Sequence, residues 1–73
     1  MNTINGIWHE QTGGKRYLAS MVDGMMIVTE RPNLYGWRVI VRGIECTGVA
    51  GTQQEAMSAA EAQYADLHIN GKP

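Results

Sequence analysis

The chain has 73 residues and a mass of 8.0 kDa, which is enough for one small domain spanning residues 1–73. Hydrophobic residues make up 44% and charged residues 18%, a balance that indicates a globular protein and excludes a disordered chain. The formal net charge of −1 excludes a polybasic tail, and the single cysteine excludes a disulfide framework and a cysteine-based zinc site.

The location is predicted from the same composition. No apolar run approaches the roughly 18 residues of a membrane-spanning helix, so we expect no membrane partner. Residues 1–5 carry neither a basic segment nor a long apolar stretch, which predicts that there is no signal peptide. With one free thiol, these features predict a cytoplasmic protein, in the host cell if it is phage-encoded.

The first predicted elements are two strands, residues 16–22 and 25–31, joined by Asp-Gly at 23–24. Asp-Gly between apolar runs favours a two-residue turn, because both positions take positive φ. This turn places Val22 opposite Met25, and cross-strand partners share a face. The pairing predicts two faces: Tyr17, Ala19, Met21, Met26 and Val28 on one, and Arg16, Leu18, Ser20, Val22, Met25, Ile27, Thr29 and Arg31 on the other.

Two further strands are predicted after the break at residues 32–36: residues 37–42 and residues 44–49. With Arg42-Gly43 as the loop, Val41 faces Ile44 across the hairpin. One face then carries Trp37, Val39, Val41, Ile44 and Cys46, and the other carries Arg38, Ile40 and Arg42.

The sequence allows two interpretations of each of two short segments. Leu34 and Tyr35 are apolar residues in a predicted loop, where they either take part in recognition or close one end of the core. Residues 4–9, around Ile7 and Trp8, either add an N-terminal strand or tuck Trp8 against an edge of the sheet.

A single helix follows the strands. Thr52 and Glu55 have the spacing of a capping box, which predicts a helix that begins there and ends at about Leu67 or His68. Apolar residues form one stripe at helical spacing: Ala56, Met57, Ala60, Tyr64 and Leu67. The fold class is therefore α+β, with a three- to four-stranded antiparallel sheet followed by one C-terminal helix packed on one face.

One helix covers only one face of such a sheet, so the opposite face is predicted to be an interface. An apolar patch rimmed by arginine is typical of a contact surface. The residues predicted to form it are Arg16, Leu18, Val22, Met25, Ile27, Arg31, Arg38, Ile40 and Arg42. The alternative is that Ile4, Ile7 and Trp8 fold over this patch. If the patch is an interface, Ile27→Lys disrupts association without unfolding the domain.

The residues that could act in catalysis or bind a metal lack the partners that these roles require. His9 and His68 lack a partner at metal-ligand spacing, and Cys46 lies at an expected core position without a base nearby. Gly13-Gly14-Lys15 lacks the other residues of a phosphate-binding loop. We therefore expect a protein that is not an enzyme and uses no metal or cofactor.

Parts of the sequence resemble known groups of proteins. The segment from Trp37 to Leu67, with Gly-Trp-Arg-Val at 36–39 and Gly-Thr-x-x-Glu-Ala at 51–56, resembles small uncharacterised phage and prophage proteins. The order of strands before one helix is similar to that of the arm-binding domains of tyrosine integrases and of plant ethylene-response DNA-binding domains. That resemblance implies a sheet face that binds DNA, on which Arg16, Arg31, Arg38 and Arg42 would lie.

Two functions follow from these observations. The favoured hypothesis is a non-catalytic protein-interaction module, phage- or mobile-element-encoded, that forms a homodimer or binds a host or phage protein, for example as an inhibitor. The alternative is sheet-face DNA binding. A net charge of −1 argues against DNA, because DNA affinity comes largely from neutralised phosphates.

Overall fold

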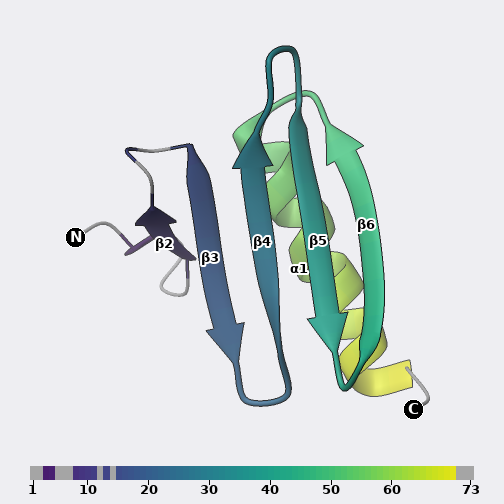
Figure 1. Ribbon diagram of the computed structural model, residues 1–73. Coiled ribbons are helices and arrows are strands. Elements are labelled where there is room, and N and C mark those ends of the chain that lie inside the picture. The colour runs from purple at the N-terminus through teal and green to yellow at the C-terminus, as the bar shows by residue number, and fades with distance from the viewer. Residues whose placement is uncertain (1–2, 5–7, 12, 14, 71–73) are drawn as a thin grey trace.

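The protein forms two layers, one antiparallel sheet and one helix lying across its back (Figure 1). The computed structural model describes residues 3–4, 8–11, 13 and 15–70. The elements are β1 (Thr3–Ile4), β2 (Trp8–Gln11), β3 (Arg16–Met21), β4 (Gly24–Glu30), β5 (Tyr35–Val41), β6 (Ile44–Ala50) and α1 (Gln53–Asn70). Within the described ranges, no helix has the length and apolar character that crossing a membrane requires.

The α+β class and the antiparallel sheet are confirmed, but the sheet is wider than predicted. The strands lie side by side in chain order. Five of them, β2 to β6, have four or more residues, and the two-residue β1 pairs with β2. The prediction of three to four strands was too low because β2, with the sequence Trp-His-Glu-Gln, has only one strongly apolar residue to mark it as a strand.

The position of Trp8 decides whether this residue covers the open face of the sheet. Strand β2 pairs with β3, with His9 opposite Leu18, so Trp8 projects to the helix side. Its side chain is fully buried, and its indole Nε1 donates a hydrogen bond to Oε2 of Glu61 in α1 at 2.7 Å. Trp8 therefore belongs to the core and does not cover the open face. Ile7 and the side chain of Ile4 lie outside the described residues.

The register of the first hairpin differs from the prediction by two residues. Met21 lies opposite Gly24, so the loop is Val22-Asp23 rather than Asp23-Gly24. The physical reason is that Asp23 is held by distant groups: its backbone oxygen accepts a hydrogen bond from the backbone N of Arg42 at 3.0 Å, and its side chain contacts the helix. A shift of two residues leaves the side chains within the strands on their predicted faces, because the period of a strand is two, and moves Val22 into the loop.

The second hairpin forms in the predicted register. Val41 lies opposite Ile44 and Val39 opposite Cys46. Arg42 and Gly43 form the loop with φ values of 49° and 87°, as a two-residue turn of the I′ type requires.

Helix α1 begins where its cap predicts. The backbone N of Glu55 donates to Oγ1 of Thr52 at 3.1 Å, which satisfies one of the free N–H groups of the first turn. The helix extends to Asn70, slightly beyond the predicted end. Its buried stripe closes the core, which consists of Trp8, Tyr17, Ala19, Met26, Val28, Val39, Val41, Ala56, Met57, Ala60 and Leu67.

Candidate binding groove on the open sheet face

Strand alternation places a mixed row of polar and apolar side chains on the face opposite α1. The register aligns His9, Leu18, Ile27, Arg38 and Thr47 in one row across five strands. A neighbouring row contains Gln11, Arg16, Thr29, Gly36 and Val49. Because these positions alternate with the buried core positions, all of them face away from the helix.

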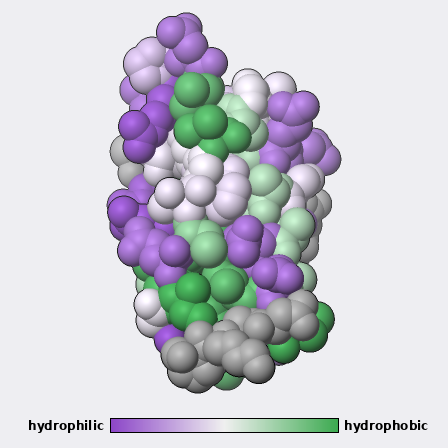
Figure 2. Space-filling view, turned by 90° about the vertical axis from the view of Figure 1, so that its right-hand side faces the viewer, coloured by the Kyte–Doolittle hydropathy of each residue, from purple (hydrophilic) through white to green (hydrophobic). Residues whose placement is uncertain are grey.

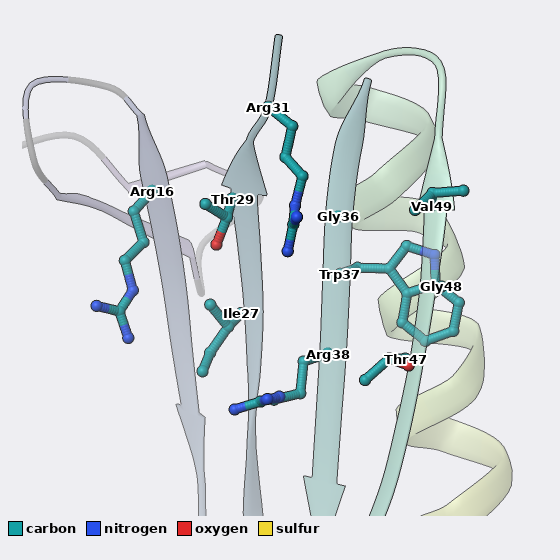
Figure 3. A pocket seen from close by; sticks show the side chains of 10 residues that line it. All are labelled: Arg16, Ile27, Thr29, Arg31, Gly36, Trp37, Arg38, Thr47, Gly48 and Val49. Atoms are coloured by element: carbon teal, nitrogen blue, oxygen red, sulfur yellow. The ribbon is translucent and has the colours of Figure 1, made fainter. Parts of the chain in front are cut away.

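The parts of these rows that lie on β3 to β6 contribute to a groove of about 540 Å³. Figure 3 shows Arg31 running down between β4 and β5 and Arg38 pointing from β5 toward β4, whereas Arg16 extends along the outer side of β3. Its lining residues are Arg16, Ile27, Thr29, Arg31, Gly36, Trp37, Arg38, Thr47, Gly48 and Val49. The groove thus combines three guanidinium groups, two hydroxyl groups and an apolar floor.

Glycine at position 36 lets Arg31 lie across the sheet. A Cβ atom at Gly36 would stand 3.0 Å from Nε of Arg31, a contact tighter than most side chains accept. The absence of a side chain at this open-face position therefore leaves room for the arginine to lie over β5. Arg31 follows the end of β4, yet its guanidinium reaches into the groove.

The groove is electropositive in a protein of nearly zero net charge. Arg38 pairs with Glu45, with Nε and Oε2 separated by 2.8 Å, and both side chains are about half exposed. Within the described part of the chain, no carboxylate forms an ion pair with Arg16 or Arg31. Three arginines and one glutamate give this face a formal charge of +2, whereas α1 carries three acidic residues and no lysine or arginine.

The residues predicted for the interface separate into two groups. Seven of the nine lie on or beside the open face: Arg16, Leu18, Met25, Ile27, Arg31, Arg38 and Ile40. The other two lie in turns. Val22 is fully exposed in the loop between β3 and β4, and the guanidinium of Arg42 turns toward the helix, where Nη2 donates to the backbone oxygen of Leu67 at 3.0 Å. Arg42 therefore does not belong to the groove.

Several lining residues lie outside the set predicted for the interface. Thr29 lies on its predicted face although the predicted site does not include it, and strand alternation places Thr47 on the same face. Of the two open loop residues, Tyr35 packs against the core, whereas Leu34 lines a smaller hollow of about 360 Å³ that also includes Val49 and Arg31.

A second polar cluster joins both hairpin loops to the end of α1. Tyr64 Oη donates to Oδ1 of Asp23 at 2.6 Å, and Nδ1 of His68 lies 2.7 Å from Oδ2 of the same carboxylate. Nη1 of Arg42 approaches Oδ2 of Asp23 to 2.8 Å. The rings of Tyr64 and His68 stack at 5.6 Å. Because one carboxylate receives groups from the loop between β5 and β6 and from α1, we assign this cluster a structural role.

The stability of this cluster depends on pH. The hydrogen bond from Tyr64, and then the bond with His68, hold the pKa of Asp23 below its usual 3.8. A carboxylate with a lowered pKa stabilises the fold above its unfolded pKa and loses that contribution as the pH falls. We therefore expect Asp23→Asn to lower the melting temperature at pH 7 and to lower it progressively less below about pH 4. A difference in melting temperature that stays constant down to pH 2 would contradict this assignment.

At alkaline pH the cluster loses stability as the pH rises, because Tyr64 ionises. The hydrogen bond to Asp23, together with burial, raises the pKa of Tyr64 above 10.0. The stabilisation by Tyr64 is therefore present below pH 10 and is lost as the phenol ionises above it. The variant Tyr64→Phe removes this group and serves as the control in the same pH series.

Metal-ligating and nucleophilic groups do not gather in the groove or in the cluster around Asp23. Among residues 3–4, 8–11, 13 and 15–70 there is no cluster of three or more side chains of the types that ligate metals. Cys46 is half-buried on the helix side of β6, where it packs against the core. The arrangement on the open face is suited to binding carboxylate or phosphate groups through arginine.

Comparisons with known proteins found no match: no family model, no curated protein and no solved structure is similar to the chain.

Proposed function

We propose that the protein is a non-catalytic interaction module that binds an acidic protein segment in the groove lined by Arg16, Arg31 and Arg38. The observation that supports this most directly is the arrangement of three guanidinium groups around an apolar floor on the face opposite the helix. Carboxylates on the partner would pair with the arginines, and its apolar side chains would pack on Ile27.

The charge distribution favours a protein partner over DNA. The open face has a formal charge of +2 and the helix has one of −3, before any contribution from His68. DNA affinity comes largely from neutralised phosphates, and DNA-binding proteins with strong salt dependence make about 6–10 phosphate contacts. Arg16 and Arg31, which form no ion pair with the described residues, supply too few such contacts, whereas arginine beside apolar surface is typical of protein interfaces.

Binding of a peptide by isotope-labelled protein tests this proposal. The probe is a 12-residue peptide in which Leu and Asp alternate, and a peptide with Asn in place of Asp is its control. We expect the acidic peptide to shift the amide signals of Ile27, Thr29 and Thr47 in NMR spectra. Arg31→Ala should weaken binding by about tenfold or more, because a charge-assisted hydrogen bond is lost. Lys15→Ala, at an exposed turn position outside the groove, should change it by less than about twofold.

A DNA duplex of 16 base pairs is titrated in the same way at 50 and 200 mM salt. Binding of the duplex with a steep loss of affinity at the higher salt concentration, and no response to the peptide, would overturn the assignment in favour of DNA. Equal affinity for the Asp and Asn peptides would show that the arginines do not select the partner.

A further inference from the structure

The outer edge of the sheet at β6 offers a row of unpaired backbone groups. Within the described residues β6 pairs only with β5. Just after the end of β5, the backbone N of Arg42 donates a hydrogen bond to the backbone oxygen of Asp23. Hydrogen bonding alternates along an antiparallel strand, so the even-numbered residues of β5 bond to β4 and its odd-numbered residues bond to β6. Their partners on β6 have even numbers. The N–H and C=O groups of Glu45, Thr47 and Val49 therefore point outward.

Of the features by which edge strands are usually protected, this edge has one charged side chain, Glu45. Strand β6 has seven residues, with no proline or lysine, and its only charged residue is Glu45. The side chains of Glu45, Thr47 and Val49 are all exposed, and that of Val49 is 65% exposed. The opposite edge is the two-residue strand β1, and shortness is itself a protective device. Figure 2 looks onto the β6 side, where hydrophobic and neutral surface forms a column with hydrophilic side chains mostly to either side.

We propose that β6 pairs antiparallel with β6 of a second copy of this chain, so that two sheets join into one across a two-fold axis at Thr47. In this register Thr47 faces its own counterpart and Glu45 faces Val49 of the second copy. All three outward-facing residues then exchange backbone hydrogen bonds. The contact is isologous and leaves no free β6 edge, so the assembly stops at the dimer.

The side chains favour this register over those centred on the other two outward-facing residues. Centring the pair on Glu45 would place two glutamates directly opposite each other, which is destabilising, and centring it on Val49 would shorten the paired segment. In the Thr47-centred register two threonines meet at the axis, a favourable cross-strand pair. The second copy's Glu45 would lie beside Val49, in the row that contains Gly36, over which Arg31 lies. This places a carboxylate next to the electropositive groove.

The size of the domain is consistent with this assembly. A chain of 73 residues buries a smaller share of its surface than larger domains do, and Cys46 is its only cysteine, so an intramolecular disulfide is excluded. Self-association through β6 uses backbone groups at the edge of the sheet, whereas the proposed function uses side chains of the open face. The two proposals therefore stand or fall separately.

Thr47→Pro is the direct test. The N–H of Thr47 points outward, so proline removes no hydrogen bond to β5 but blocks pairing with a second copy. By sedimentation equilibrium we expect a wild-type mass of twice 8.0 kDa at high concentration. The variant's dissociation constant should be about 25-fold higher or more, because the symmetric contact loses two hydrogen bonds at about fivefold each. Thr47→Lys, which keeps the backbone intact, should act in the same direction by placing like charges at the axis.

Controls separate this contact from its alternatives. Ser20→Lys introduces the same charge at an exposed open-face position on β3, away from the β6 edge, and should leave the dimer intact. A protein that sediments at 8.0 kDa up to millimolar concentration would overturn the proposal. So would a dimer that resists Thr47→Pro and Thr47→Lys but dissociates on Ile27→Lys, because that result assigns association to the open face.

Discussion

Replacing Trp8 with alanine is expected to lower the free energy of unfolding by about 3–5 kcal/mol, the usual range for removing a buried aromatic side chain. The indole is fully buried between β2 and α1, and it donates a hydrogen bond of 2.7 Å to Glu61. Small domains have a total stability of about 5–15 kcal/mol, so this loss removes a large part of it. Urea denaturation followed by circular dichroism measures the change.

Two variants separate the packing of Trp8 from its hydrogen bond. Trp8→Phe keeps most of the buried volume, and we expect it to be less destabilising than alanine. Glu61→Gln keeps an oxygen acceptor for the indole N–H and should cost about 1 kcal/mol or less. A loss below about 1 kcal/mol for Trp8→Ala would mean that β2 contributes little to the core, and it would contradict the packing described above.

The second large effect is expected at Gly24, where a single methyl group meets the backbone. A Cβ atom there would lie 2.0 Å from the backbone oxygen of Ile40 and 2.9 Å from Cα of Val41. Backbone atoms cannot rotate away as a side chain does, so β4 and β5 would have to separate locally. We expect Gly24→Ala to lower the stability by about 3 kcal/mol, the upper end of the usual range for overpacking.

Thermal unfolding checks this expectation. For a domain of this size, a loss of about 3 kcal/mol corresponds to a fall in melting temperature of roughly 12–24 °C. Gly51→Ala is the matched control, because the nearest atom to its Cβ is the flexible Oε1 of Glu55 at 3.4 Å. Equal melting temperatures for the two variants would show that β4 and β5 are not in the close register described here.

Gly24 also explains why the first hairpin loop is Val22-Asp23 and not the predicted Asp23-Gly24. Locally, Asp23-Gly24 is a favourable turn pair. In the structure Gly24 is instead the first residue of β4, where the absence of a side chain permits the close approach of β5. Asp23 is held by Tyr64, which is distant in the sequence. Local turn preference is a small energy, and several tertiary contacts outweigh it.

The candidate groove shows the same division between local and distant information. Alternation in β4 and β5 placed Ile27 and Arg38 on the open face, and the two-residue shift in register did not change this. By contrast, Arg42 has the correct alternation for that face, yet it lies in the turn and binds the end of the helix. Its position depends on where α1 ends in space, which no local pattern contains.

The sequence by itself determined the α+β class, the two faces of the central strands, the register of the second hairpin and the start of the helix at Thr52. These features depend on periodicity, turn residues and caps, all of which act over a few neighbouring residues. Only the tertiary structure decided the side on which Trp8 lies, the loop at Val22-Asp23 and the free edge of β6. Each of these depends on contacts between segments far apart in the chain, whose energies appear only when the layers pack together.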